Sequence, residues 1–119
     1  MAVRIGIMGF GRLGRNMFRI AHDQPDVEFV AVSDIADADS LAYLLQFSTV
    51  EGRFPIDVRR EGSYLVAGRQ RVRVLRGSHP GDVPWDVLGA DIVIESTGQF
   101  RRRADLQKHL DAGAKRVIL

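Results

Sequence analysis

The stretch VRIGIMGFGRLGR, residues 3–15, decides the fold, because an apolar segment typical of a buried strand runs directly into the spacing G-x-G-x-x-G. In that spacing Gly9 allows a tight turn out of the strand, and Gly11 lets backbone N–H groups approach a pyrophosphate. Gly14 lets the following helix pack closely on the sheet. The first amides of a helix lack intrahelical partners and carry partial positive charge, so this helix N-terminus suits a diphosphate.

A second apolar run, residues 27–32, ends in Ser33 and Asp34, and Asp34 lies 20 residues beyond Gly14. A strand, a helix and a second strand within roughly 30 residues are typical of a dinucleotide-binding unit. A carboxylate at this position accepts hydrogen bonds from the adenosine ribose and repels a 2′-phosphate, which favours NAD over NADP. In the alternative interpretation Asp34 is a polar strand end and the glycines form an ordinary turn.

The composition limits the classes of protein. A chain of 119 residues is expected to form one domain, residues 1–119, and the absence of cysteine excludes disulfides, thiolate metal sites and a cysteine nucleophile within it. His22, His79 and His109 do not have the spacing of metal ligands. No apolar run approaches the roughly 18 residues of a membrane span, and no signal-peptide segment is visible, so we expect a cytoplasmic location. A net charge of +2 gives little support for nucleic-acid binding.

Apolar periodicity predicts the helices that follow. Leu13, Met17, Ile20 and Ala21 have helical spacing, which predicts a helix to about His22 with these side chains inward. The strands before and after this helix are apolar at nearly every position, as in a parallel sheet covered on both faces.

The segment after Asp34 predicts a second, short helix. Residues 37–40 (DADS) offer N-cap oxygens and acidic first-turn charge to a helix with Leu41, Leu44 and Leu45 inward. Residues 46–54 are predicted to be a loop.

Alternation then predicts an antiparallel hairpin. Residues 64–66 (YLV) precede a turn at residues 67–70, and residues 71–75 (RVRVL) then alternate charge and valine, which indicates a half-exposed antiparallel hairpin at the edge of the domain. Its arginines form a solvated face that discourages edge-to-edge pairing. No aromatic residues are interleaved with them, so they do not indicate nucleic-acid binding.

A third parallel strand is predicted at residues 91–95, after a helical turn at residues 85–88. Ligands bind beyond the carboxyl ends of parallel strands, so Ser96, Thr97 and Gly98 are candidate cofactor neighbours. A helix with Leu106 and Leu110 inward should follow and stop at Gly113, before a fourth strand at residues 115–119. Residues 101–103 (RRR) oppose the dipole of that helix, which indicates either a nearby anion or a solvated charge run.

These elements predict an α/β fold of the Rossmann type. Its doubly wound sheet is mostly parallel, carries an antiparallel edge hairpin, and is incomplete at the C-terminal end because the last predicted strand has no following element.

Six short segments, in order along the chain, carry a family resemblance: GFGRLGR (9–15), SD (33–34), GRF (52–54), VPW (83–85), ESTGQF (95–100) and GAKRVI (113–118). As a set they resemble the glyceraldehyde-3-phosphate dehydrogenase family over the whole chain. The erythrose-4-phosphate dehydrogenase branch shares most of them, although residues 95–98 look more like the glyceraldehyde-3-phosphate branch.

The resemblance implies a usually tetrameric enzyme that oxidises an aldehyde phosphate with NAD and traps the acyl group with inorganic phosphate. In that family a cysteine attacks the aldehyde and a histidine assists, and neither has a counterpart among these 119 residues. The resemblance therefore implies a truncated NAD-binding portion that lacks the catalytic domain, contains no catalytic residue and is inactive alone. A further strand and a C-terminal helix complete this domain in the family, so we expect the segment to self-associate through the surfaces they would cover.

The resemblance also assigns cofactor contacts. It places the backbone N–H groups of Arg12 and Leu13 on the pyrophosphate, Asp34 on the adenine ribose, and Thr97 with Gly98 on the nicotinamide side.

The sequence departs from the family pattern in places. Met8 and Ser33 each stand where the family usually has Asn, Ser78 stands where an Arg is common, and residues 48–52 (STVEG) replace an Asp-Ser-x-His-Gly pattern. Each departure weakens a contact rather than the fold, and together they indicate a divergent relative. They also fit an alternative in which the chain is a non-catalytic nucleotide-binding or self-associating module.

Overall fold

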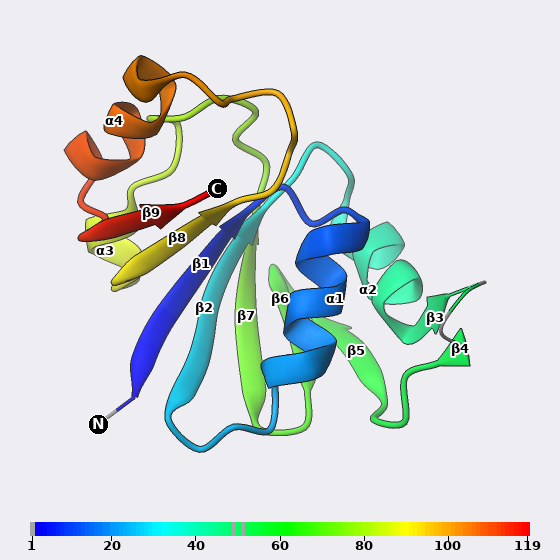
Figure 1. The fold of residues 1–119 in the computed structure, drawn as a ribbon. Coiled ribbons are helices and arrows are strands. Elements are labelled where there is room, and N and C mark those ends of the chain that lie inside the picture. The colour runs from blue at the N-terminus through cyan, green and yellow to red at the C-terminus, as the bar shows by residue number, and fades with distance from the viewer. Residues whose placement is uncertain (1, 49, 51) are drawn as a thin grey trace.

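The computed structural model describes residues 2–48, 50 and 52–119, which form a seven-stranded sheet flanked by helices and a separate two-stranded ribbon (Figure 1). The strands of the large sheet are β1 (Val3–Met8), β2 (Val27–Ser33), β5 (Val58–Glu61), β6 (Tyr64–Ala67), β7 (Gln70–Leu75), β8 (Ile92–Glu95) and β9 (Arg116–Ile118). The ribbon consists of β3 (Phe47–Ser48) and β4 (Gly52–Arg53). The helices are α1 (Arg12–Ala21), α2 (Ala38–Gln46), α3 (Trp85–Leu88) and α4 (Arg103–Asp111).

The large sheet has the strand order β5-β6-β7-β2-β1-β8-β9. Neighbouring strands from β7 to β9 pair in parallel, and β5, β6 and β7 pair antiparallel. The predicted hairpin is therefore present as β6 and β7. It lies in the antiparallel part at one end of the sheet, where β5 adds a further strand outside β6 and β7 pairs with β2.

Both faces of the sheet are covered, as the apolar strands predicted. Side chains that follow one another in a strand point to opposite faces. Accordingly Ile7 belongs to a core cluster with Phe18 under α1 and α2, whereas Met8 belongs to a second cluster with Trp85. Figure 1 shows α1 and α2 together, apart from α3 and α4. This arrangement confirms the doubly wound, mostly parallel architecture.

The predicted inward face of α1 was wrong. Leu13 and Ile20 are 58% and 76% exposed, and the buried residues of the helix are Gly14 and Phe18. The Phe18 ring lies 4.8 Å from the ring of Phe29 in β2. Aromatic packing on the sheet, together with the close approach that Gly14 allows, rotates the helix away from the apolar stripe seen in the sequence.

The second helix begins as predicted, because the side chain of Asp37 accepts a hydrogen bond of 2.8 Å from Ser40 N. This bond lowers the pKa of Asp37. Leu41 and Leu45 are buried as predicted. Leu44 is 39% exposed, so its predicted inward position was wrong.

The predicted loop at residues 46–54 was also wrong in part. Gln46 is the last residue of α2, and its buried amide Nε2 donates to Phe54 O at 2.8 Å. Residues 47–48 and 52–53 pair as β3 and β4, which are too short for alternation to reveal. Residues 49 and 51, within the predicted loop and the departure at 48–52, lie outside the described residues.

The C-terminal elements follow the prediction except for one helix face. The helical turn α3 and the parallel strands β8 and β9 are present, and Gly113 follows the end of α4 with φ +109°. Leu106 is partly buried, but Leu110 is exposed, so its inward assignment was wrong; the buried residue of α4 is His109. Among the described residues, β9 pairs only with β8, which leaves one edge of the sheet open as expected.

Candidate functional site

A hollow of about 300 Å³ lies at the carboxyl ends of β1, β2 and β8. We call it the Asp34 hollow; its lining residues are Met8, Gly9, Gly11, Ser33, Asp34, Ile35, Gly77, Ser78, Ser96, Thr97 and Gln99. The chain passes from β1 to β2 on one side and later places β8 on the other side of β1. The hollow therefore lies where the strand order reverses, which is where open α/β sheets bind ligands.

The turn after β1 forms one wall of the Asp34 hollow. Gly9 has φ +88°, and a Cβ there would lie 2.6 Å from Thr97 Cγ2, so only glycine fits. A Cβ on Gly14 would lie 2.8 Å from Gly9 O, which explains how α1 packs closely against the turn. A Cβ on Gly11 would meet nothing within 4 Å, and no side chain of the described residues caps α1. The space and the helix amides that a diphosphate needs are therefore present.

The carboxylate of Asp34 is held by the main chain. Oδ2 accepts from Phe10 N at 2.8 Å, and Oδ1 accepts from Ala36 N at 3.0 Å. A carboxylate offers about four acceptor positions, so both oxygens keep capacity for a ligand hydroxyl. These bonds tie Asp34 to the glycine turn and fix its direction before a ligand arrives.

A further wall of the hollow, adjacent to the glycine turn, comes from the end of β8. Ser96 Oγ donates to Gly9 O at 2.5 Å, and Ser96 N donates to Met8 O at 2.8 Å. Thr97 lies directly against Gly9. The residues after β1 and β8 are therefore joined by hydrogen bonds and by van der Waals contact.

The structure gathers some of the predicted cofactor residues and separates others. Gly9, Gly11, Asp34, Ser96 and Thr97 share the Asp34 hollow. A second hollow, of about 330 Å³, shares Ser96 with the Asp34 hollow. We call it the Gly98 hollow; it is lined by Leu13, Glu95, Ser96, Gly98, Arg101 and Leu119.

The remaining predicted residues have other surroundings. Gly14 is buried beneath the turn, and Arg12 lines a different hollow beside α2. Arg101 reaches the Gly98 hollow, whereas Arg102 lies 3.5 Å from Asp105, an exposed ion pair.

Sequence reasoning missed three residues of the Asp34 hollow, namely Ile35, Gly77 and Gln99. Each follows the carboxyl end of a strand, so the rule that selected Thr97 could have found them. The departures from the family pattern at Met8, Ser33 and Ser78 also line this hollow.

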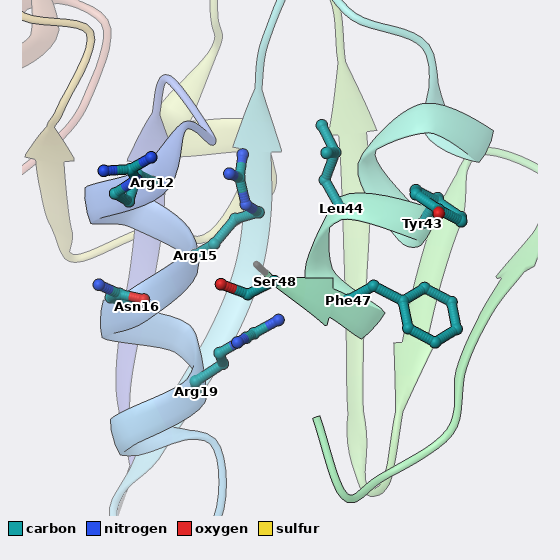
Figure 2. Close-up of a pocket in the computed structure, with 8 residues that line it drawn as sticks. All are labelled: Arg12, Arg15, Asn16, Arg19, Tyr43, Leu44, Phe47 and Ser48. Atoms are coloured by element: carbon teal, nitrogen blue, oxygen red, sulfur yellow. The ribbon is translucent and has the colours of Figure 1, made fainter. Parts of the chain in front are cut away.

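A third concave surface, of about 390 Å³, lies between α1 and the α2–β3 corner (Figure 2). We call it the arginine hollow; it is lined by Arg12, Arg15, Asn16, Arg19, Tyr43, Leu44, Phe47 and Ser48. Arg15 donates to Phe10 O at 3.0 Å and Arg19 donates to Leu45 O at 2.5 Å. Burial, and then the charges of Arg19 and Arg12, lower the pKa of Arg15. Arg15 thus holds the turn that precedes α1, and Arg19 joins α1 to the end of α2.

Other kinds of site find no support in the part of the chain that the structure describes. It contains no cluster of three or more histidine or carboxylate side chains that could hold a metal ion. None of its helices has both the length and the apolar character needed to cross a membrane.

The fold and the Asp34 hollow define a dinucleotide-binding domain of the Rossmann type. The family model for the NAD-binding domain of glyceraldehyde 3-phosphate dehydrogenase matches residues 3–103, and the chain therefore belongs to that family. The resemblance, the fold class and the NAD-binding role inferred from the sequence are confirmed by this match.

Known relatives carry the same family name. Over 119 residues the chain is 49% identical to glyceraldehyde-3-phosphate dehydrogenase of Geobacillus stearothermophilus and 49% identical to glyceraldehyde-3-phosphate dehydrogenase 1 of Bacillus subtilis (strain 168). It is 44% identical over 120 residues to the enzyme of Streptomyces coelicolor. In each case all of the chain is covered, but it spans only 36% of the relative's length.

Proposed function

We propose that the chain binds NAD in the Asp34 hollow and supplies the cofactor-binding part of a phosphorylating glyceraldehyde-3-phosphate dehydrogenase. The observation that carries this proposal is the placement of the Asp34 carboxylate, which the amide of Phe10 at the glycine turn holds at 2.8 Å. A ribose acid and a pyrophosphate turn in direct contact are what one adenosine diphosphate moiety needs.

The residues of the Asp34 hollow and of the surfaces beside it have distinct tasks in this proposal. The amides at the start of α1, those of Arg12 and Leu13, receive the pyrophosphate, and Asp34 accepts from the adenine ribose hydroxyls. Ser96, Thr97 and Gly98 form the nicotinamide side. Bound NAD supplies a hydride acceptor for aldehyde oxidation. Because the 119 residues contain no cysteine, the nucleophile must come from elsewhere, and the chain alone is expected to be inactive.

Calorimetric titration with NAD, NADP and the variant Asp34→Ala tests the proposal. We expect saturable NAD binding that NADP does not match, and a dissociation constant at least about tenfold higher for Asp34→Ala, because a hydrogen bond to a charged group contributes roughly 1.5 to 3 kcal/mol. Asp37→Ala is the control, since it removes the same charge outside the hollow. Equal affinity of the native chain and Asp34→Ala, in chains that circular dichroism shows to be folded, would reject the Asp34 assignment.

We also propose that the chain self-associates, and that the whole enzyme is a homo-oligomer located in the cytoplasm. The open edge of β9 supports association, as does a hollow of about 510 Å³ beside it whose apolar lining residues are Ile92, Leu106, Leu110, Val117 and Ile118. Light scattering at ~100 μM, where exposed strand edges cause association, should give at least a dimer mass. A monomer mass at that concentration would count against it.

A further inference from the structure

A chain of buried polar side chains runs from the α3–α4 core to the Asp34 hollow. Trp85 Nε1 donates to His109 Nδ1 at 3.0 Å, and His109 Nε2 lies 2.9 Å from Glu95 Oε1. The side chains of His109 and Glu95 are both 0% exposed. Glu95 Oε2 then accepts from Thr97 N at 3.1 Å and from Thr97 Oγ1 at 2.7 Å.

Donor counting fixes the direction of these hydrogen bonds. An indole N–H can only donate, so His109 Nδ1 must accept and cannot carry a proton. A neutral imidazole then carries its proton on Nε2 and donates it to Glu95. The tautomer of His109 is thus assigned from its partners. Glu95 accordingly acts as an acceptor for His109 and for both polar groups of Thr97.

Thr97 links this chain to the cofactor site. It lines the Asp34 hollow and lies so close to Gly9 that a Cβ on Gly9 would be 2.8 Å from Thr97 N. Its Oγ1 also accepts from Gln99 N at 3.1 Å, and Gln99 lines the same hollow. The position of one wall of the hollow therefore depends on the carboxylate beneath it.

We propose that Glu95 is a positioning residue for the cofactor site: oriented by His109 and Trp85, it holds Thr97 against Gly9 and fixes the wall formed by residues 96–99. The inference rests on the proposed function, in which NAD binds in this hollow. A wall fixed before binding removes the cost of ordering it when the cofactor arrives, and so raises affinity.

The variant Glu95→Gln tests the inference because an amide cannot accept on both sides. If the NH₂ group of the glutamine faces Thr97, two donors face each other, and the main-chain N–H of Thr97 loses its acceptor. If it faces His109, the imidazole proton must move to Nδ1, where it meets the indole N–H of Trp85. We expect the dissociation constant for NAD, measured by calorimetry, to rise about tenfold, since a hydrogen-bond donor loses its acceptor in either case.

A second substitution should weaken this effect. In Trp85→Phe the indole N–H is gone, so His109 can carry its proton on Nδ1 and accept from Gln at position 95. We therefore expect Glu95→Gln to change NAD affinity less in the Trp85→Phe background than in the native chain, a coupling that a double-mutant cycle measures. Additive effects would contradict the assigned hydrogen-bond directions.

The matched control is Gln70→Glu. Gln70 is buried in a hydrogen-bond network of its own, accepting from Phe29 N at 3.0 Å and donating to His22 O at 2.8 Å, and it does not line the Asp34 hollow. This variant should lower the free energy of unfolding without changing NAD affinity. A Glu95→Gln variant that behaves in the same way would overturn the positioning role.

Substitutions at Thr97 test the same link if Glu95→Gln does not fold. Thr97→Ser keeps the hydroxyl that bonds Glu95, and Thr97→Val keeps the shape without it. We expect the serine variant to bind NAD more tightly than the valine variant, and the reverse order would contradict the inference. A folded native chain that does not bind NAD would overturn the proposed function, and this inference with it. Native binding without an effect of Glu95→Gln would overturn the inference alone.

Discussion

Replacing Gly9 by alanine is expected to abolish measurable NAD binding and to lower the free energy of unfolding by about 2 to 5 kcal/mol. The residue has φ +88°, a region in which a side chain costs roughly 1 to 2 kcal/mol. Its methyl carbon would also lie 2.6 Å from Thr97 Cγ2 and 2.8 Å from Thr97 N. Because the second of these atoms is main chain, the clash pushes the end of β8 away from β1. Urea unfolding followed by the fluorescence of Trp85, the single tryptophan, measures the loss of stability.

Gly11→Ala is the control that separates the fold from the site. Gly11 has φ −78°, and a Cβ there meets nothing within 4 Å, so alanine should leave the unfolding curve nearly unchanged. Its methyl group would project into the space that the pyrophosphate approaches, so NAD affinity should still fall. A Gly9→Ala variant as stable as the native chain would contradict the role given to Gly9. A Gly11→Ala variant that binds NAD as tightly as the native chain would contradict the role given to Gly11.

The order of the elements and much of the candidate site could be predicted because they depend on local sequence. A strand followed by fixed glycine spacing determines where β1 ends and α1 begins. The rule that ligands bind beyond the carboxyl ends of parallel strands selects Thr97 from the sequence alone. Asp34 is found by its distance from Gly14 along the chain. None of these inferences depends on which side chains meet across the fold.

The faces of the helices could not be predicted in the same way. Periodicity establishes that residues 12–21 are helical, but the buried side depends on what the rest of the chain provides. Phe18 turns inward because Phe29 in β2 lies opposite, and the aliphatic side chain of Ile20 stays exposed. In α4 the buried position is held by His109 and Leu110 is exposed, because Trp85 and Glu95 supply polar partners for the imidazole.

The Glu95–His109 contact also lay beyond sequence reasoning, which considered the histidine only as a possible metal ligand. The two residues are 14 positions apart, on a strand and a helix whose packing the sequence does not state. A glutamate closing the apolar run of residues 92–95 was the one signal in the sequence, since a buried carboxylate requires hydrogen-bond donors.

His109→Leu should produce the largest loss of stability, about 3 to 5 kcal/mol, because it removes one partner of a fully buried polar pair. Glu95 would keep only its bonds to Thr97, and the indole N–H of Trp85 would lose its acceptor. The free energy of unfolding of a native domain is only roughly 5 to 15 kcal/mol in total, so the midpoint of urea unfolding should fall sharply. A midpoint close to that of the native chain would show that the pair adds little to stability.

The double variant Glu95→Met/His109→Leu separates stability from cofactor binding. Replacing a buried polar pair by apolar side chains of similar size is often neutral, so most of the stability lost in His109→Leu should return, apart from the cost of the orphaned indole N–H. NAD affinity should stay low, because Thr97 no longer has the carboxylate that holds it against Gly9. Unfolding in urea and calorimetric titration of the same sample measure the two quantities. Recovery of both would mean that packing alone positions Thr97, whereas recovery of stability alone assigns that task to the carboxylate.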